Sequence, residues 1–328
     1  MQHLKSADFS AKLGGVSSEP PSTTPDQAVA IPSRQAGLSR ADLMALTKAR
    51  LSLMVLVTTF IGFWAASRSL GKFDWWLLVH TLIGSALAAA ASSVFNQLIE
   101  IEIDAKMKRT ADRPLPARKI SPAAAFILGW VLAALGLLHL GAKVNTAAAV
   151  LTGLTLVIYV FIYTPMKQKS SLNTIVGAVS GGIPPMIGWV AAGGEVWTPE
   201  CWFLFGLLFL WQLPHFVAIN WMYRDQYREA GFVMWSNDDE SGQKTANLAI
   251  LFSAMTLALM VVPSVYGFAN IGFLIGGVLL SGIMLALAVK FRQTCTRQAA
   301  RKLFFYTLIY LPLVLVLLVL TWRRSGGV

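Results

Sequence analysis

The chain has 328 residues, of which 55% are hydrophobic and only 13% are charged, and its mean hydropathy is +0.60. A soluble domain of this size carries roughly twice that charged fraction, so the composition argues against a soluble enzyme. The net charge is +11, and the two cysteines, Cys201 and Cys295, are too few and too far apart for a disulfide framework or a Cys-x-x-Cys metal site.

Residues 1–45 form a polar N-terminal segment that is rich in Ser, Thr and Pro. No apolar stretch lies near its start, so we do not expect a signal peptide. Its low hydrophobicity predicts a disordered cytoplasmic tail, with Ser39 or Asp42 starting a helix near residue 40. Mitochondrial presequences avoid acids, whereas this tail contains several, so a bacterial cell inner membrane is the expected location.

Nine apolar runs follow the tail, each close to the roughly 20 residues that cross a bilayer core of about 30 Å as a helix. The predicted spans lie near residues 50–69, 75–99, 121–140, 145–163, 173–193, 201–222, 247–267, 271–290 and 303–322. They predict an all-α polytopic membrane protein with about nine transmembrane helices around a central cavity. Together they form one transmembrane domain over residues 46–324.

The basic residues are distributed unevenly along this pattern. If the N-terminus is cytoplasmic, most of the 27 Lys and Arg residues fall in the tail and in the loops after spans two, four, six and eight. The exceptions are Arg68, Lys72, Lys143, Arg323 and Arg324. This distribution follows the positive-inside rule and accounts for the basic charge without nucleic acid.

The loop after the second span mixes acids with bases, although a topology signal needs no acids. Asn96, Glu100 and Asp104 are spaced four residues apart, so on a helix they share one face. Three oxygen-bearing side chains near the membrane surface form half of a site for Mg²⁺, which takes oxygen ligands and often binds substrate phosphates. The alternative is a solvated loop with local ion pairs.

Basic residues come directly after this acidic motif in the sequence. Lys106, Arg109 and Arg113 can bind the oxygens of a diphosphate that a metal does not neutralise. At the end of the fourth span, Tyr163 and Lys167 are also four residues apart, which suits a phenol donor and a phosphate clamp facing one cavity. An interfacial Tyr beside a snorkelling Lys is the alternative interpretation.

A second acidic pair repeats the spacing after the sixth span. Asp225 and Glu229 are four residues apart, and Arg224 and Arg228 flank them. Because this pair comes four spans after the first motif, it predicts two similar halves that each turn an acidic helix end toward a shared cavity. The predicted metal ligands are therefore Asn96, Glu100, Asp104, Asp225 and Glu229.

Three runs resemble one family closely: NQLIEIEIDAKMKRTADRPLP, YTPMKQKSSLNTIVGAVSGGIPPMIGW and WQLPHFVAINWMYRDQYREAG. They are similar to the protohaem IX farnesyltransferases (haem O synthases), a branch of the UbiA-type intramembrane prenyltransferases, over roughly residues 45–322. The superfamily motif Asn-x-x-x-Asp-x-x-x-Asp matches Asn96, Glu100 and Asp104, and Asp-x-x-x-Asp matches Asp225 and Glu229. The two Glu replacements keep a carboxylate but alter the reach available to a metal.

The resemblance implies a transferase that moves the farnesyl group of farnesyl diphosphate to a vinyl group of protohaem IX (haem b), giving haem O. It implies Mg²⁺, with Mn²⁺ as a substitute, surrounding membrane lipid, and contact with the enzyme that next modifies haem O. The implied catalytic residues are Asp104, Arg109, Arg113, Tyr163, Lys167 and His215. The implied substrate-binding residues are Asn96, Arg109, Arg113, Lys167, His215 and Arg224.

The sequence leaves open the role of His215, the identity of the acceptor, and the alternative of a transporter. His215 follows Pro214, which removes a backbone hydrogen bond, so the histidine either contacts haem or has a structural role beside the proline. A related membrane prenyltransferase with an aromatic or chlorin acceptor would carry the same metal motif. A cation-coupled transporter also places acids in broken membrane helices, but at the midplane and not at inner helix ends.

Overall fold

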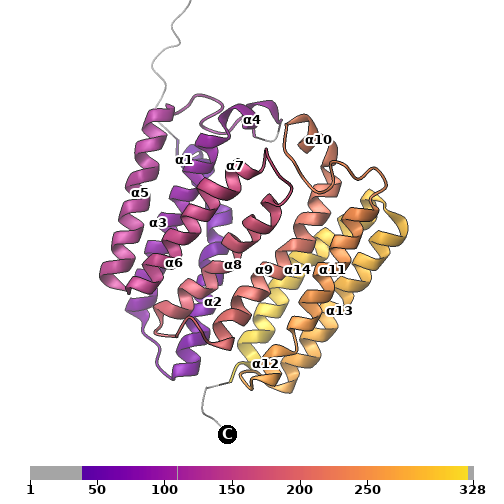
Figure 1. Ribbon diagram of the computed structural model, residues 1–328. Helices are drawn as coiled ribbons and strands as arrows, with labels where there is room; N and C mark the ends of the chain where they lie inside the picture. Colours follow the sequence, from indigo (N-terminus) through magenta and orange to yellow (C-terminus); the bar gives the residue numbers. More distant parts are fainter. Residues whose placement is uncertain (1–38, 109, 324–328) are drawn as a thin grey trace, which may run out of the picture. The chain divides into compact units, whose positions relative to one another are not determined.

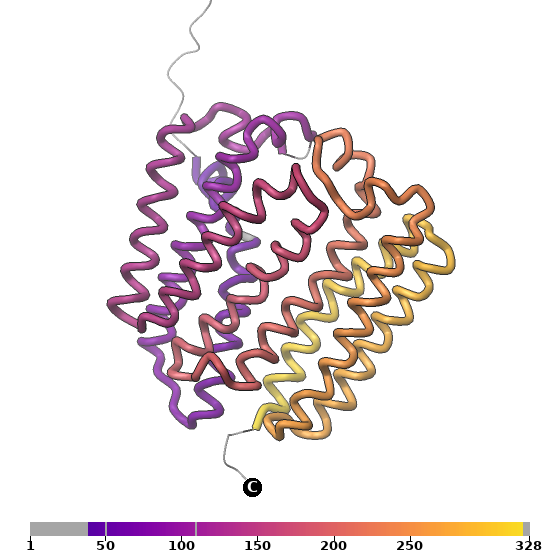
Figure 2. Tube along the Cα trace, in the orientation of Figure 1, coloured from indigo at the N-terminus to yellow at the C-terminus, as the bar shows by residue number. Residues whose placement is uncertain are grey.

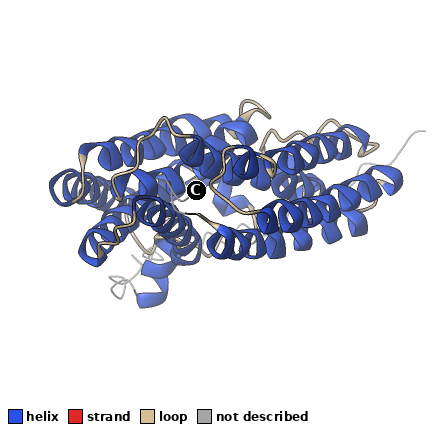
Figure 3. Cartoon of the chain, turned by 90° about the horizontal axis from the view of Figure 1, so that it is seen from below, coloured by secondary structure: helices blue, strands red, loops and turns tan. Residues whose placement is uncertain are grey.

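The computed structural model describes residues 39–108 and 110–323 of the chain (Figure 1). Every regular element in that part is a helix, and Figure 3 draws no strand. One isolated antiparallel bridge joins Ala269 to Trp322. The prediction of an all-α protein is confirmed.

Nine segments of the described chain are helical, long and apolar enough to span a membrane. Seven of them are single helices: α2 (Ala49–Leu70), α3 (Trp75–Ile99), α5 (Pro122–Lys143), α8 (Asn173–Ala191), α9 (Pro199–Met222), α13 (Ile271–Thr294) and α14 (Arg297–Thr321). The other two spans are interrupted. The fourth consists of α6 (Thr146–Val157), a π-helical turn (Ile158–Tyr163) and α7 (Thr164–Met166). The seventh consists of α11 (Gln243–Leu259) and α12 (Val262–Val265). Shorter helices outside the spans are α1 (Arg40–Leu46), α4 (Ile101–Lys106) and α10 (Arg224–Glu229).

The nine predicted spans are all present, but several helices extend beyond the apolar runs. The sequence suggests a polar loop between residues 290 and 303, whereas α13 continues to Thr294 and α14 begins at Arg297. Between them, Cys295 takes a left-handed backbone conformation with φ 47°. Hydropathy marks only the bilayer core, while helical hydrogen bonding continues into the polar interface, so the apolar run underestimates the length of the helix.

Polar residues define where many of these helices begin. Asp74, Ser121, Asn145, Thr198 and Thr296 each accept a hydrogen bond from a backbone N–H in the first turn of α3, α5, α6, α9 and α14, respectively. These caps satisfy donors that have no partner inside the helix. Ser39 caps α1 in the same way, so a helix starts at residue 40, within the range predicted as a tail. The rest of that range, residues 1–38, lies outside the described residues.

Glycines bring two of the spans into close contact. A Cβ atom at Gly188 in α8 would lie 1.8 Å from the carbonyl oxygen of Thr59 in α2, and one at Gly62 in α2 would lie 1.8 Å from the carbonyl oxygen of Pro185. Small residues permit this backbone approach, which stabilises membrane helix pairs by dispersion contacts. On its other side α8 packs against α9, and the trace in Figure 2 shows how these central helices link the first spans to the last.

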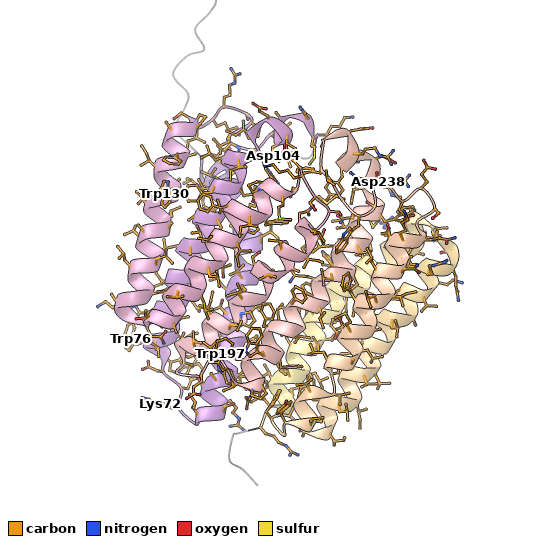
Figure 4. All side chains as sticks on the ribbon, in the orientation of Figure 1. Lys72, Trp76, Asp104, Trp130, Trp197 and Asp238 are labelled. Atoms are coloured by element: carbon orange, nitrogen blue, oxygen red, sulfur yellow. The ribbon has the colours of Figure 1, made fainter. Side chains whose placement is uncertain are left out.

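The second and the sixth span both end in a one-residue helix break that is followed by a short helix. Helix α3 ends at Ile99, Glu100 breaks the helix, and α4 follows; α9 ends at Met222, Tyr223 breaks the helix, and α10 follows. Both short helices lie at the same end of the spans (Figure 1). Figure 4 places Asp104 at this end and Lys72, Trp76 and Trp197 at the opposite end.

Candidate functional site

The first acidic motif lines a polar cavity of about 180 Å³ at the end of the second span. Asn96, Glu100 and Asp104 are all buried and all contribute to its wall. The backbone keeps their spacing across the helix break, because the Glu100 N–H donates to the Asn96 carbonyl at 3.1 Å and the Asp104 N–H donates to the Glu100 carbonyl at 2.8 Å. The three polar side chains therefore share one face.

Three cationic side chains meet these groups inside the cavity. The Lys167 ammonium donates to Glu100 Oε1 at 2.8 Å, and the Arg113 guanidinium donates to Asp104 Oδ2 at 2.6 Å. Lys48 donates to Asn96 Oδ1. Each polar residue of the motif is thus paired with a base from a different part of the chain.

Burial and like charge set the protonation of this cluster. Desolvation, followed by repulsion from Lys167 and Arg113, lowers the pKa of Lys48 from 10.5 to about 7. Desolvation also raises the pKa of Asp104, although the nearby Arg113 acts in the opposite direction. Three cations face two carboxylates, so a polyanion that enters the cavity would relieve repulsion between the bases.

Lys48 lines this cavity, although it belongs to none of the charged motifs in the sequence. It occupies the short link between α1 and α2 with a left-handed backbone, φ 47°, which costs a residue with a Cβ atom roughly 1 kcal/mol. Strain of this kind concentrates at functional sites. No periodicity in the sequence indicates a positive φ at this position, so only the fold reveals the residue.

Tyr163 and Lys167 face the cavity together, as their spacing suggests. The Lys167 ammonium lies 4.6 Å from the centre of the Tyr163 ring, and both side chains line the cavity. Tyr163 ends a π-helical turn, a feature that is frequent at functional sites. The Lys167 carbonyl accepts a hydrogen bond from the Val233 N–H at 2.7 Å, which attaches this corner to the loop after α10.

For the second acidic pair the structure differs from the prediction. Asp225 and Glu229 are exposed and do not line the cavity, whereas Tyr227, which lies between them in sequence, is buried and does. Tyr227 packs with Ile103 of α4, Phe232 and Met234 in an apolar cluster. Because this cluster turns the Tyr227 face of α10 inward, the two carboxylates two positions away on either side point outward.

Two other predicted residues also lie outside the cavity, and one cannot be placed. Arg224 contacts Asp225 at 3.3 Å and donates to the Asp239 carbonyl at 3.0 Å. His215 faces α14 instead, where its ring stacks on Phe304 with centroids 4.7 Å apart. Arg109 lies outside the described residues.

The hydrogen bonds of His215 define which ring nitrogen carries a proton. Its Nδ1 lies 2.9 Å from Thr307 Oγ1, and that hydroxyl donates its single hydrogen to the Phe304 carbonyl at 2.6 Å. Thr307 can therefore only accept from His215, so Nδ1 is the protonated nitrogen. This leaves the lone pair of Nε2 unbonded among the described residues, in the arrangement that metal-binding histidines commonly adopt.

A model of the UbiA prenyltransferase family matches residues 55–310 of this chain. The chain belongs to the UbiA prenyltransferase family. The resemblance to protohaem IX farnesyltransferases is confirmed by relatives with that name. The protein from Opitutus terrae is 41% identical over 281 residues, which is 85% of this chain and 94% of the relative. The human mitochondrial protein is 34% identical over 285 residues, covering 87% of this chain and 63% of the relative.

Solved structures of UbiA-family proteins share the fold. A digeranylgeranylglyceryl phosphate synthase aligns with a TM-score of 0.74 at 17% identity, over 85% of this chain and 97% of that chain. A UbiA homologue from Archaeoglobus fulgidus bound to DMAPP and Mg²⁺ aligns with a TM-score of 0.58 at 13% identity, over 84% of this chain and 98% of that chain. This chain is accordingly a multi-pass membrane prenyltransferase with the helical UbiA architecture.

Proposed function

We propose that this chain transfers the farnesyl group of farnesyl diphosphate to a vinyl group of protohaem IX, which yields haem O. The observation that carries the proposal is the cavity in which Lys48, Arg113 and Lys167 meet Glu100 and Asp104 at one end of the apolar spans. A charged diphosphate fits this polar cavity, while the spans below it offer an apolar environment for the isoprenoid chain. Relatives that are 31–41% identical carry the name of this activity.

The reaction requires that the bond between C1 of farnesyl and the diphosphate oxygen breaks. The diphosphate leaves with the bonding electron pair, and the vinyl group of haem supplies the electrons for the new carbon–carbon bond. Water then adds to the resulting cation beside the porphyrin ring and loses a proton, which leaves a hydroxyethylfarnesyl group. The departing negative charge is the part of this sequence that the cavity is equipped to stabilise.

The cations bind the diphosphate by exchanging partners. In the structure Lys167 is paired with Glu100, and Arg113 is paired with Asp104. A bound diphosphate competes for both bases, and we assign Arg109, four residues before Arg113 in the sequence, to the same role. Tyr163 lines the same wall and supplies a phenolic hydrogen-bond donor. Preorganised donors that neutralise a leaving group are worth several kcal/mol to the chemical step.

The carboxylates released from these ion pairs fit a hard cation. Mg²⁺ in phosphate-binding sites is typically held by one or two carboxylates, several waters and the substrate phosphates. Asn96, Glu100 and Asp104 provide such an oxygen set in this cavity. When bound, Mg²⁺, or Mn²⁺ in its place, would supply Lewis-acid neutralisation of the diphosphate. Asp225 and Glu229 are left out of this ligand set because they face away from the cavity.

His215 is the residue through which the acceptor contacts the protein. Its Nε2 lone pair is available for the haem iron or for a proton, and its Nδ1–H is held by Thr307. The aromatic neighbours Trp211 and Phe304 fix the plane of the ring, with centroids 5.7 and 4.7 Å from that of His215. Haem O is in turn the substrate of a further haem-modifying enzyme, with which contact is expected.

The charge distribution favours a bacterial inner membrane orientation with the N-terminus and the active site in the cytoplasm. Lys72, one of the few basic residues outside the predicted inner loops, lies at the opposite end from Asp104 (Figure 4). In this arrangement residues 1–45, which include most of helix α1, form a cytoplasmic N-terminal segment, and residues 46–324 form the transmembrane prenyltransferase domain.

The test is pigment analysis of the purified protein incubated with farnesyl diphosphate and haem b. We expect haem O and one diphosphate per molecule of product. A parallel incubation with 4-hydroxybenzoate and with a chlorin tests the alternative acceptors. Farnesylation of either of these in place of haem b would overturn the proposal while leaving the prenyltransferase family assignment intact.

A further inference from the structure

A second cavity, of about 620 Å³, lies where the end of α9 meets the start of α14. Its wall combines two guanidinium groups with aromatic rings, from Tyr223, Arg297, Arg301, Phe304 and Phe305. It shares no lining residue with the cavity of Glu100 and Asp104. Its volume falls within the roughly 300–1,000 Å³ of pockets that bind ligands of drug size, whereas the first cavity is smaller.

The two arginines of this cavity have no carboxylate partner among the described residues, unlike Arg113, Lys167 and Arg224. They lie over aromatic rings instead: Arg297 is 5.9 Å from the ring centre of Tyr223, and Arg301 is 5.4 Å from that of Phe305.

The charges of these two arginines oppose each other and the helix dipole. Arg297 and Arg301 are four residues apart on one helix, where like charges repel, and Arg297 lies in the first turn of α14, where the helix dipole is positive. A ligand with two negative groups would remove both penalties. The arrangement therefore favours a dianionic ligand with an apolar body.

The cavity also borders the histidine assigned to the acceptor. Phe304 lines the cavity, and the same ring stacks on His215. Met222, another lining residue, follows His215 by two turns of α9, which is about 10 Å along the helix axis. A flat ligand whose charged edge lies at the arginines would extend along α9 and α14 toward His215.

We propose that this cavity binds the carboxylate edge of the porphyrin acceptor, with Arg297 and Arg301 each pairing with one propionate. The inference rests on the proposed function, since it takes haem b as the acceptor. Haem carries two carboxylates on one edge of a flat apolar macrocycle, which matches two guanidinium groups flanked by aromatic rings. Anchoring that edge at the membrane surface directs the vinyl groups on the opposite part of the ring into the apolar interior.

The test is a titration of haem b binding, followed by absorbance, in nanodiscs of neutral phosphatidylcholine. Arg297→Gln and Arg301→Gln should each raise the Kd for haem roughly tenfold, as expected for loss of one charge-assisted hydrogen bond, and the double variant should raise it further. Lys302→Gln is the matched control, because it removes one charge from the same exposed helix end outside the cavity, and it should bind haem as the wild type does. Binding of farnesyl diphosphate should be unchanged in all four proteins, which also shows that they are folded.

Haem dimethyl ester, which lacks the two negative charges, separates the carboxylate contact from general packing. The wild type should bind the ester about as weakly as the double variant binds haem, and the arginine substitutions should not weaken ester binding further. Equal losses for haem and ester, or unchanged haem affinity in both single variants, would overturn the inference. An arginine effect seen only in anionic membranes would also overturn it, because the guanidinium groups would then bind lipid headgroups. Failure of the wild type to form haem O would instead contradict the proposed function.

Discussion

Lys167 Nζ lies 2.8 Å from Oε1 of Glu100, although the two residues are 67 positions apart in the chain. The pair connects the end of the fourth span to the end of the second, and only 12% and 5% of the two side chains are exposed. Removing one partner of a buried ion pair leaves an uncompensated charge and costs about 3–5 kcal/mol. The ion pair therefore fixes Lys167 and Glu100 in the cavity, where the proposed function assigns Lys167 to the diphosphate.

The two acidic motifs should differ in their effect on catalysis. Asp104→Asn removes a carboxylate that lines the cavity and is 2% exposed, so we expect at least about a hundredfold loss of kcat/KM. Asp225→Asn changes a side chain that is 74% exposed, and its loss should stay within about tenfold. The measurement is haem O formation by both purified variants. Equal losses would show that α10 rotates its acids into the cavity when substrate binds.

Diphosphate binding should depend on the protonation of Lys48. Burial lowers the pKa of Lys48 to about 7, so this side chain loses its proton above neutral pH. The charged groups that face it are Glu100, Asp104, Lys167 and Arg113. A bound anion favours the protonated form, so affinity should fall as the pH rises from 7 to 9. Calorimetric titration with inorganic pyrophosphate should show a steeper fall for the wild type than for Lys48→Met. Affinity that falls equally with pH in both proteins would contradict this prediction. The protonation of pyrophosphate itself changes identically in the two titrations, so it cannot produce a difference between them.

The lowered pKa of Lys48 also makes the stability of the protein depend on pH. Stability should rise with pH, whereas affinity for the diphosphate should fall. Below about pH 7, Lys48 is protonated in the folded and the unfolded chain alike. Between about pH 7 and its ordinary pKa of 10.5, the unfolded chain binds a proton that the folded chain does not, so the free energy of unfolding rises with pH in this window. The midpoint temperature of thermal unfolding should rise between pH 7 and pH 10, and this rise should be smaller for Lys48→Met than for the wild type.

Removal of divalent metal should abolish turnover and weaken substrate binding together. Treatment with a chelator leaves Glu100 and Asp104 paired with Lys167 and Arg113, so the diphosphate must compete for these bases without help from a cation. We expect farnesyl diphosphate affinity to fall at least tenfold and to recover with added Mg²⁺. Full turnover in a protein shown to be metal-free would contradict the assigned role of the first acidic motif.

His215 should decide the electronic environment of bound haem. Because Nδ1 donates to Thr307, Nε2 is the nitrogen that can contact haem. His215→Ala removes this nitrogen, so it should shift the Soret band of bound haem and reduce turnover at least tenfold. His139→Ala is the control, because that residue lies in α5, where it pairs with His80 of α3 at 3.2 Å. An unchanged spectrum with unchanged turnover would leave His215 with only a structural role.

Close packing of α2 and α8 predicts one large effect on stability. Gly188→Ala places a Cβ atom 1.8 Å from the Thr59 carbonyl oxygen. The backbone of α8 fixes that Cβ, and the oxygen belongs to the backbone of α2, so the helices must separate. We expect a loss of about 3 kcal/mol in the free energy of unfolding. Gly282→Ala meets nothing within 4 Å and serves as the control. Similar unfolding curves for the two variants would show that the α2–α8 contact can relax.

The amino-acid sequence by itself determined the class of the protein, the number of its spans and the composition of the first acidic motif. These properties are local: an apolar run of about 20 residues spans a bilayer wherever it lies, and a spacing of four residues places Asn96, Glu100 and Asp104 on one helix face. The same reasoning placed Asp225 and Glu229 on a common face.

Only the tertiary structure decided which way such a face points and which bases reach it. Helix α10 turns Tyr227 inward because Ile103, Phe232 and Met234 form an apolar cluster with it, and no property within α10 reports that contact. Lys48 enters the cavity because the link between α1 and α2 adopts a left-handed conformation. Periodicity specifies which side chains lie together on one element, whereas burial against distant elements specifies which of those faces meets the substrate.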